Sequence, residues 1–576
     1  MTYQTHKLAK DLGWTVETDF PLWGNNSLYL TTIKGGYLQK GETPRQAYDR
    51  LAKTASSLLN KPELEEKFFE IFWNGWLIPS TPVMANLGND KGFPISCFSG
   101  IIGDSMYEIG RKNTELMMLS KHGGGTAYDF SDIRAMGTPI KGGDGGTSDG
   151  IIPFIKMFDS TILASKQSNV RRGAVAIYLD AEHPEVSEFL RIRQPKGDIN
   201  RQCTNIHQGI KVSDEFMNRV ISREHKAVEL WKEIQKTRVE TGEPYIFYTD
   251  NVNKNLPEYW KTQNLKVKHS NLCNEICLPT DHEHSLVCCL SSLNLSKYDE
   301  WKDTDTIFLS TLFLDAVISE FLIKGENVKG IEDTVRFAKK SRALGLGVQG
   351  YHTYIQAKGI PFVGIQSNAM TRIIFGNIQK ETIRATEYLA KEYGEPEWCK
   401  GSGRRNLTLT TVPPTKSSSK LSGGNSEGIE PIMANIYLDD GAKGNHIRRN
   451  PNLEVLLTEK GKNTNEVWDS ISDYEGSVQH LNFLSKDEKD VFLTFREINQ
   501  LELVKLAGIR QQYLEQSQSL NLAFFQDASA KWINKVHITA WECGVKSLYY
   551  LKSKSSLKAN AVNQRDLYSE CLMCEG

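Results

Sequence analysis

From about residue 150 to residue 550 the sequence alternates short runs of β-branched residues with long stretches of helical periodicity. The runs include GAVAIYLD and NLTLTTV, and the helical patterns cover 370–392, 487–513 and 530–543. Such alternation is typical of βαβ units, in which helices cover a mostly parallel sheet. It constrains the chain more than any single motif does, and it predicts an α/β fold with a parallel sheet or barrel.

The two ends of the chain differ from this middle part. Residues 43–76 have helical character, with Thr43 as a predicted N-cap and Pro44 in the first helical position. After Tyr550 the composition becomes polar, with few apolar residues to bury. We therefore expect a helical region near the start of the chain and a flexible tail at its end.

Composition excludes several classes of protein. Hydrophobic residues make up 39% of the chain and charged residues 24%, which is typical of a globular protein. The formal net charge of −1 argues against a nucleic-acid or membrane surface. The stretch TIFLSTLFLDAVISEFLI contains Asp315 and Glu320 and has helical spacing, so we expect a buried helix rather than a membrane span. No apolar signal segment opens the sequence, and we expect a cytoplasmic protein.

Two of the ten cysteines, Cys571 and Cys574, form a Cys-x-x-Cys pair in the C-terminal sequence SECLMCEG. In a reducing compartment the cysteines do not form a disulfide framework. The tail pair has three interpretations: half of a zinc site, a redox pair, or no role. Zinc needs further ligands, and no second Cys-x-x-Cys or paired histidine motif occurs in the sequence, so we predict no metal site.

The stretch HSNLCNEICLP, residues 269–279, places a thiol and a carboxylate two positions apart. In an extended segment, side chains at alternate positions share one face, so Asn271, Cys273 and Glu275 would point into the same space. Burying such a polar set among leucine and isoleucine is costly without a function. The alternative is a core cysteine beside a surface glutamate, and this stretch alone does not decide between them.

Vicinal cysteines and vicinal tyrosines form two further motifs. Cys288 and Cys289, in LVCCLSSLNL, would face opposite sides of a strand, so that one packs in the core while the other faces a cavity. Two core cysteines are the simpler interpretation of that stretch alone. Tyr549 and Tyr550, in KSLYYLKS, indicate a function only if a redox system lies nearby.

A cluster of hydroxyl groups lies in VPPTKSSSKLSGGNSEGIEP, residues 412–431, just before a predicted helix. Hydroxyls and free backbone N–H groups at a helix start can bind an anion. The stretch lacks the Gly-x-x-x-x-Gly-Lys-[Ser/Thr] pattern of a Walker loop. By composition alone, a polar linker is the alternative.

Taken in order along the chain, these stretches resemble the large (α) subunit of class I ribonucleotide reductases. The similarity runs through GGYLQKGETP, WLIPSTPVMANLG, ISCFSGIIGDSM, GTPIKGG, SNLCNEICLPT, CLSSLNL, ALGLGVQGYHTYI, the hydroxyl-rich stretch, EQSQSLN, GVKSLYY and the tail cysteines. It implies a ten-stranded α/β barrel of two five-stranded halves over residues 96–552. It also implies an N-terminal helical region over 1–95, without the ATP-cone of many family members, and a flexible redox-active tail over 553–576.

The resemblance assigns a role to the cysteines and to the other polar residues of the core motifs described above. Cys273 would carry a thiyl radical that takes the 3′ hydrogen of the substrate ribose. Glu275 would act as general base at the 3′ hydroxyl, with its pKa raised by burial, and Asn271 would hold that hydroxyl. Cys97 and Cys288 would supply two electrons and two protons when the 2′ hydroxyl leaves as water, and would become a disulfide.

The resemblance also implies binding residues and a two-fold interface. Substrate contacts match Thr81, Ser96, Gly125, Thr415, Ser417, Ser418 and Ser419. A deoxynucleotide or ATP effector at an allosteric specificity site would contact Asp104, Ser105 and Lys141. Residues 197–205 would relay the identity of the effector to the active site. Because that effector site forms between two α subunits in the family, we expect a homodimer.

Radical supply and re-reduction both imply partner proteins. Tyr549 and Tyr550 would carry a radical from a separate ferritin-like small subunit, so this chain would hold no cofactor of its own. Cys571 and Cys574 would re-reduce the buried cysteine pair by thiol exchange and pass the oxidation to thioredoxin or glutaredoxin. Cys571 lies 21 residues beyond Tyr550, and an extended tail of that length reaches about 70 Å.

The resulting hypothesis is a ribonucleoside-diphosphate reductase that makes DNA precursors. One alternative is a cobalamin-dependent (class II) reductase on the same barrel, which the tyrosine pair disfavours. Another is a non-catalytic paralogue, which predicts the loss of catalytic positions. Every such position is present in this sequence.

Overall fold

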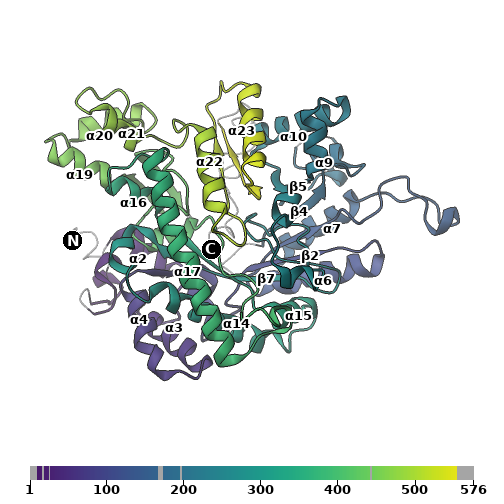
Figure 1. The fold of residues 1–576 in the computed structure, drawn as a ribbon, viewed down its shortest axis with the longest axis horizontal. Coiled ribbons are helices and arrows are strands. Elements are labelled where there is room, and N and C mark those ends of the chain that lie inside the picture. The colour runs from purple at the N-terminus through teal and green to yellow at the C-terminus, as the bar shows by residue number, and fades with distance from the viewer. Residues whose placement is uncertain are drawn as a thin grey trace.

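The N-terminal part of the chain is helical. A computed structural model describes residues 9–15, 18–24, 26–165, 173–194, 197–441 and 444–553 (Figure 1). The main helices of its first part are α2 (Ser27–Lys34), α3 (Pro44–Leu58) and α4 (Glu65–Trp73). Thr43 caps α3 by accepting from the backbone N–H of Gln46, whose side chain in turn accepts from the N–H of Thr43. This capping box satisfies two N–H groups that the helix leaves free and confirms the predicted N-cap.

A nine-stranded sheet forms the centre of the protein. Its strands are β1 (Leu77–Pro79), β2 (Cys97–Ile101), β3 (Gly125–Asp129), β4 (Val175–Asp180), β5 (Ile206–Val212), β6 (Tyr245–Tyr248), β7 (Leu286–Asn294), β8 (Leu344–Gln349) and β12 (Ser547–Leu548). Strands β2 to β6 are parallel neighbours in sequence order and form one five-stranded half. Strand β7 pairs antiparallel with β2 and parallel with β8, so it joins the two halves.

The second half of the barrel is less regular than the first. The run NLTLTTV does not form a strand; it joins the sheet through single bridges from Leu346 to Thr410 and from Val412 to Gln518. Pro413 and Pro414 follow it directly, and because proline has no N–H to donate, the ladder cannot continue through them. The predicted α/β barrel is confirmed, with this half built partly from irregular chain.

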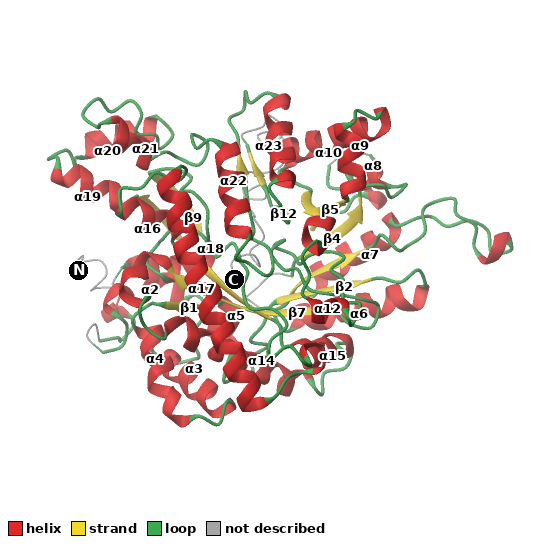
Figure 2. Ribbon diagram, in the orientation of Figure 1, coloured by secondary structure: helices red, strands yellow, loops and turns green. Residues whose placement is uncertain are grey.

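Long helices cover the outside of the barrel, as Figure 2 shows. They include α6 (Met106–Lys121), α7 (Ile152–Ala164), α10 (His225–Thr241), α14 (Thr306–Gly325), α15 (Glu332–Ser341), α17 (Ile365–Tyr393), α22 (Gln500–Gln511) and α23 (Ala530–Glu542). The helical patterns at 370–392 and 530–543 correspond to α17 and α23. The pattern at 487–513 is divided between α21 (Lys486–Val491) and α22.

Helix α14 is the one described helix long and apolar enough to cross a membrane, and 78% of its most apolar window is buried inside the protein. The carboxylate of Asp315, fully buried on this helix, accepts from the guanidinium of Arg342 at 2.8 and 2.9 Å and from Arg405 at 3.0 Å. These cations hold the pKa of Asp315 below its usual value against the opposing effect of burial. The expected buried helix is therefore confirmed, with its acidic residue paired inside the core.

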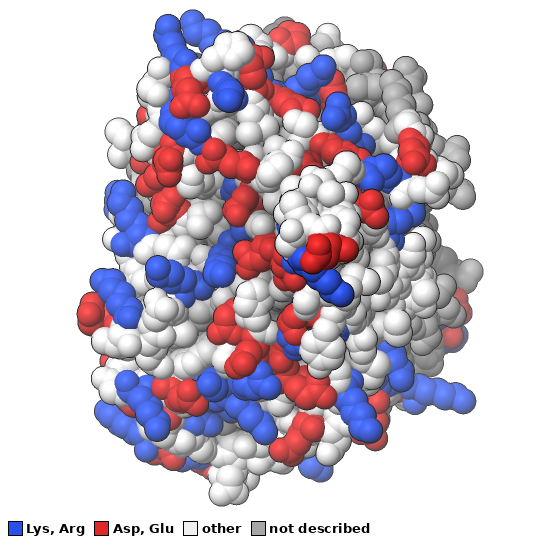
Figure 3. Space-filling view, turned by 90° about the vertical axis from the view of Figure 1, so that its right-hand side faces the viewer, with Lys and Arg blue, Asp and Glu red and all other residues white. Residues whose placement is uncertain are grey.

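A small second core lies apart from the barrel, at the upper left of Figure 1. Helices α19 (Pro451–Glu459), α20 (Asn465–Asp473) and α21 pack their apolar side chains around the buried Trp468. The hairpin of β9 (Ile436–Gly441) and β10 (Gly444–Arg449) precedes them in the chain. On the face drawn in Figure 3, basic and acidic side chains are interspersed.

Candidate active site

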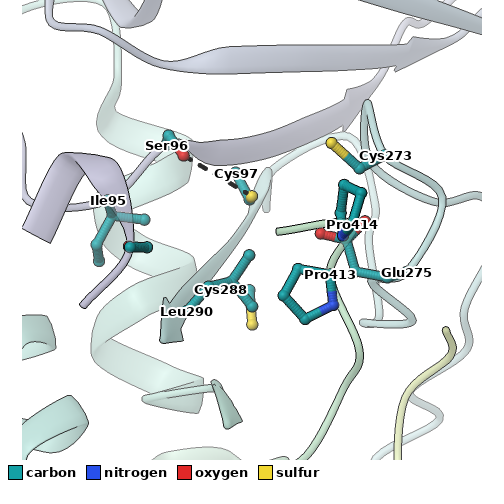
Figure 4. Close-up of a pocket in the computed structure, with 10 residues that line it drawn as sticks. Ile95, Ser96, Cys97, Cys273, Glu275, Cys288, Leu290, Pro413 and Pro414 are labelled. Carbon is teal, nitrogen blue, oxygen red and sulfur yellow. Dashed lines mark hydrogen bonds between the residues drawn. The ribbon is translucent and has the colours of Figure 1, made fainter. Parts of the chain in front are cut away.

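A buried pocket lies inside the barrel where β2, β7 and the loop before β7 meet (Figure 4). Its lining residues are Ser80, Ile95, Ser96, Cys97, Cys273, Glu275, Cys288, Leu290, Pro413 and Pro414. They come from segments up to 334 residues apart in sequence, from Ser80 to Pro414. The pocket thus brings together three thiols and one carboxylate.

Cys97 and Cys288 face each other across two antiparallel strands. Cys97 is the first residue of β2, and its register partner on β7 is Cys288. Directly opposed residues in such a ladder have Cα atoms about 4.5–5.5 Å apart. A disulfide needs a Cα separation of about 4.4–6.8 Å. Both thiols are free in the structure, and the backbone geometry allows them to be joined.

Cys289 faces the other side of β7. Its neighbours include Asp315 and Arg342, which lie on the helical layer outside the barrel, and burial raises the pKa of its thiol. Gln516 donates from its amide to the sulfur of Cys288 at 3.4 Å, on the pocket side. Cys288 therefore lines the pocket, and Cys289 packs in the core.

The loop that carries Cys273 and Glu275 is a turn, not an extended segment. Leu272, Cys273 and Asn274 form its tip, and Asn274 has a left-handed φ of 62°. The predicted extended segment, with alternate residues on one strand face, is therefore wrong for this loop, although both Cys273 and Glu275 line the pocket. Asn271 stabilises the turn, because its side-chain oxygen accepts from the N–H groups of Glu275 and Ile276, each at 3.1 Å.

Glu275 is a fully buried carboxylate with an unusual pKa. Burial raises the pKa of Glu275 to about 7, against the opposing effects of its own N–H and the side chains of Asn271 and Ser519. Its Oε1 atom and the Nδ2 atom of Asn271 are both buried without a hydrogen-bond partner in the described ranges. An unpaired acceptor beside an unpaired donor suits a ligand group that both donates and accepts, such as a hydroxyl.

The facing thiols of Cys97 and Cys288 are held in their neutral form. Burial raises the pKa of Cys97 well above its usual value, and the nearby Glu275 and Cys288 add to the rise. Burial likewise raises the pKa of Cys288. Nucleophilic cysteines have lowered pKa values, so these thiols suit a reaction that uses S–H groups as hydrogen and electron donors.

Tyr549 and Tyr550 belong to a compact aromatic group. Their ring centroids are 4.2 Å apart, and Tyr245 on β6 lies 4.7 Å from Tyr549 and 5.1 Å from Tyr550. The Tyr245 hydroxyl donates to that of Tyr550 at 2.9 Å. Behind Tyr550, His207 Nδ1 lies 3.4 Å from its hydroxyl and 2.7 Å from Glu243 Oε1. No local motif marks Tyr245 in the sequence, because only the pairing of β6 with β12 brings it here.

Of the expected substrate residues, one lines the pocket and others adjoin residues that line it. Ser96 lines it, Gly125 is the register partner of Cys97, and Thr81 directly follows the lining residue Ser80. The hydroxyl cluster begins next to Pro414 and leads into a short helix, α18 (Lys416–Leu421), as predicted. Its expected phosphate contacts are buried: Thr415, Ser417, Ser418 and Ser419.

The expected effector residues lie away from the pocket. Asp104 forms an ion pair with Arg134 at 2.7 Å, and Ser105 caps α6 by accepting from the N–H of Glu108 at 3.2 Å. Lys141 lies in the short 3-10 helix η3 (Lys141–Gly143) and is exposed. No hydrogen bond or ion pair joins Lys141 to the other two within the described ranges.

Two further expectations concern cysteines and metal. Cys571 and Cys574 lie outside the described residues. Within the described part of the chain, no group of three or more histidine, cysteine and acidic side chains is placed to hold a metal ion.

Fold and site together define an α/β-barrel enzyme whose buried pocket combines a facing cysteine pair, a third thiol and a carboxylate of raised pKa. Comparison with known families identifies it further. The ribonucleotide reductase barrel domain matches residues 95–226, 221–402 and 397–551, and the ribonucleotide reductase all-alpha domain matches residues 25–92. The chain belongs to the ribonucleotide reductase large-subunit family.

Individual relatives support the same assignment. The α subunit of the Actinobacillus ureae class Id ribonucleotide reductase superposes with a TM-score of 0.86 at 40% identity, covering 93% of this chain and 98% of its own. A Frog virus 3 (isolate Goorha) protein, proposed as a ribonucleoside-diphosphate reductase large subunit, is 36% identical over 98% of this chain and 100% of its own length. The ribonucleoside-diphosphate reductase large subunit of Invertebrate iridescent virus 3 is 32% identical over 96% and 98%.

Proposed function

We propose that this chain is the catalytic subunit of a ribonucleoside-diphosphate reductase and converts ribonucleotides to 2′-deoxyribonucleotides through a thiyl radical on Cys273. The observation that carries the proposal is the convergence of Cys97, Cys273, Glu275 and Cys288 on one buried pocket. The family membership supports it, and so does the tyrosine group, which follows Leu548, a residue hydrogen-bonded to the loop that carries Cys273.

In the proposed reaction the sulfur radical of Cys273 takes the 3′ hydrogen atom of the ribose. Glu275 accepts the proton of the 3′ hydroxyl while the Asn271 amide holds that oxygen, which uses both unpaired buried atoms. The 2′ hydroxyl leaves as water after protonation. Cys97 and Cys288 supply two electrons and two protons and become a disulfide, and the hydrogen atom returns from Cys273 to the 3′ carbon.

The remaining roles follow the same resemblance. The substrate phosphates bind at Thr415 and the serines that follow it, and an effector binds near Asp104, Ser105 and Lys141 between two copies of the chain. A ferritin-like small subunit supplies the radical through Tyr550 and Tyr549. Thioredoxin or glutaredoxin restores the tail cysteines, and the enzyme works in the cytoplasm.

The radical source is the most direct test of this proposal. The chain, its small subunit, a ribonucleoside diphosphate and a dithiol reductant are expected to produce deoxynucleotide, measured by chromatography. The same mixture without the small subunit is expected to be inactive, with or without adenosylcobalamin. Activity with adenosylcobalamin alone would assign the chain to the cobalamin-dependent class instead.

The pKa of Glu275 predicts how activity depends on pH. A general base must be deprotonated, and this carboxylate loses its proton near pH 7. We expect kcat/KM, which reports the free enzyme, to fall about tenfold per pH unit below that value and to level off above it. A Glu275→Gln variant should have little activity at any pH. A flat profile from pH 5.5 to 8 in the parent enzyme would contradict the assigned role.

The proposed role of the tail cysteines predicts that their loss affects multiple turnovers but not the first turnover. A Cys571→Ser/Cys574→Ser variant is expected to complete one turnover when its pocket cysteines start reduced, and to stop when thioredoxin or glutaredoxin must regenerate them. The reason is access, because a protein-sized reductant cannot enter the barrel. Product per active site in a pre-reduced burst measures the first step, and the steady-state rate measures the second. Full steady-state activity would exclude the shuttle.

A further inference from the structure

Asn274 lies between the two reactive residues of the loop, Cys273 and Glu275, and is fully buried. Its amide nitrogen donates to the carbonyl of Leu548 at 3.0 Å and to that of Ile246 at 3.2 Å. Its side-chain oxygen accepts from the hydroxyl of Tyr178 at 3.0 Å. Both donor hydrogens and the acceptor are therefore used, all within the barrel.

The two carbonyls that Asn274 binds belong to the strands that carry the tyrosines. Leu548 immediately precedes Tyr549, and Ile246 immediately follows Tyr245. Leu548 and Ile246 are register partners in the antiparallel pair of β12 and β6. One amide group thus ties the tip of the cysteine loop to both strands of the aromatic group.

Backbone contacts of the same loop lead to the same strand. The Ser547 hydroxyl donates to the carbonyl of Asn274 at 2.6 Å, and the Ser519 hydroxyl donates to that of Cys273 at 2.6 Å. The N–H of Tyr549 donates to the carbonyl of Leu520, one residue beyond Ser519, at 2.8 Å. The cysteine loop and the tyrosine strand are therefore connected through one continuous hydrogen-bond network, with Asn274 at its centre.

Asparagine meets two requirements at this position. The left-handed φ of 62° favours glycine, asparagine or aspartate over other residues. Glycine has no side chain to bind the strands. Aspartate has no N–H donors and would place a carboxylate against two carbonyl oxygens, which leaves buried acceptors unpaired.

We propose that Asn274 is a positioning residue that sets the distance between the Tyr549 phenol and the Cys273 thiol. This role rests on the function proposed above. In that step the phenoxyl oxygen of Tyr549 takes the hydrogen atom of Cys273. One S–H bond breaks, one O–H bond forms, and the unpaired electron moves to sulfur; the small subunit supplies the initial oxidising equivalent. A misplacement of about 1 Å between reacting groups can cost about a hundredfold in rate.

Asn274→Gly tests this role because glycine keeps the left-handed backbone and removes only the three side-chain hydrogen bonds. In the holoenzyme with its small subunit, we expect kcat to fall about ten- to a hundredfold, with the KM for substrate changed less than threefold. Asn264→Gly is the matched control, because Asn264 is also left-handed, with φ of 53°, but is exposed. It should leave kcat unchanged.

A second readout separates positioning from a general structural role. With 3-aminotyrosine at position 549, which is oxidised more easily than tyrosine and holds the radical, electron paramagnetic resonance counts radicals that reach this residue. Asn274→Gly should reach the same radical yield as the Asn274 parent, because only the step after Tyr549 is impaired. The radical yield of the aminotyrosine enzyme is compared with the kcat of the enzyme that has tyrosine at position 549. If Asn274→Gly lowers both by the same factor, Asn274 acts through folding or partner docking, and the proposal is wrong.

Tyr178→Phe provides a milder variant should Asn274→Gly fold poorly. It removes the hydroxyl that donates to the Asn274 side chain and to the Asn271 carbonyl, at 3.0 and 2.7 Å, and keeps the ring. A reduction of kcat of a few fold, again with normal radical yield at position 549, is expected. An unchanged kcat in both variants overturns the positioning role while leaving the proposed reductase function intact. An inactive parent holoenzyme would instead refute that function.

Discussion

Replacing Cys273 with serine is expected to abolish deoxynucleotide formation, by more than about a thousandfold, or about 4 kcal/mol in transition-state stabilisation. Serine is close to cysteine in shape and would fit the buried tip of the loop. Its O–H bond is much stronger than an S–H bond, so a tyrosyl radical cannot take that hydrogen atom. The measurement is one pre-reduced turnover with the small subunit present, so that tail chemistry plays no part.

The control for this variant is Cys289→Ala. Cys289 is buried and lies on the same strand as Cys288, but it faces the helical layer outside the pocket. The Cys289→Ala variant is expected to retain the single-turnover product yield of the parent enzyme. Substrate binding by Cys273→Ser, measured by calorimetry, should match that of the parent enzyme. Product formation by Cys273→Ser would show that the radical resides on another residue.

Replacing Tyr549 with phenylalanine is expected to reduce deoxynucleotide formation by a similar factor, more than about a thousandfold. The Tyr549 ring is buried and packs on Tyr245 and Tyr550, and phenylalanine preserves this packing. It lacks the O–H group that must be oxidised and then receive the hydrogen atom of Cys273. The variant should therefore fold, bind its small subunit and bind substrate, yet form no product.

Two further tyrosine variants serve as comparisons for the Tyr549→Phe result. Tyr474→Phe changes an exposed tyrosine that follows α20 and should retain full activity. Tyr245→Phe removes one hydrogen bond to Tyr550 but no residue of the proposed radical path, so a smaller loss is expected. Activity of Tyr549→Phe within tenfold of the parent would mean that the radical bypasses this position.

Local sequence patterns predicted the features that depend on near neighbours. The N-cap at Thr43 follows from hydrogen-bond chemistry within one helical turn. The opposite orientation of Cys288 and Cys289 follows from the two-residue period of a strand. The burial of α14 follows from its apolar composition, although the ion pairs of Asp315 with Arg342 and Arg405 do not.

Non-local contacts account for the features that the patterns missed. The Cys273 loop was expected to be extended, but it turns at Asn274, because hydrogen bonds from Asn274 to β6 and β12 hold that left-handed conformation. NLTLTTV has strand composition but joins the sheet only by single bridges, since two prolines end it. Tyr245 has no recognisable motif and reaches the aromatic group through strand pairing alone.

By itself, the sequence determined the class of fold, the family resemblance and the residue types available for chemistry, since these depend on composition, periodicity and motif order. Only the tertiary structure decided which side chains meet. Cys97 and Cys288 are 191 residues apart in the chain and become neighbours through the register of β2 on β7. The raised pKa of Glu275 has the same origin, because burial is a property of the assembled barrel and not of the residues beside it in sequence.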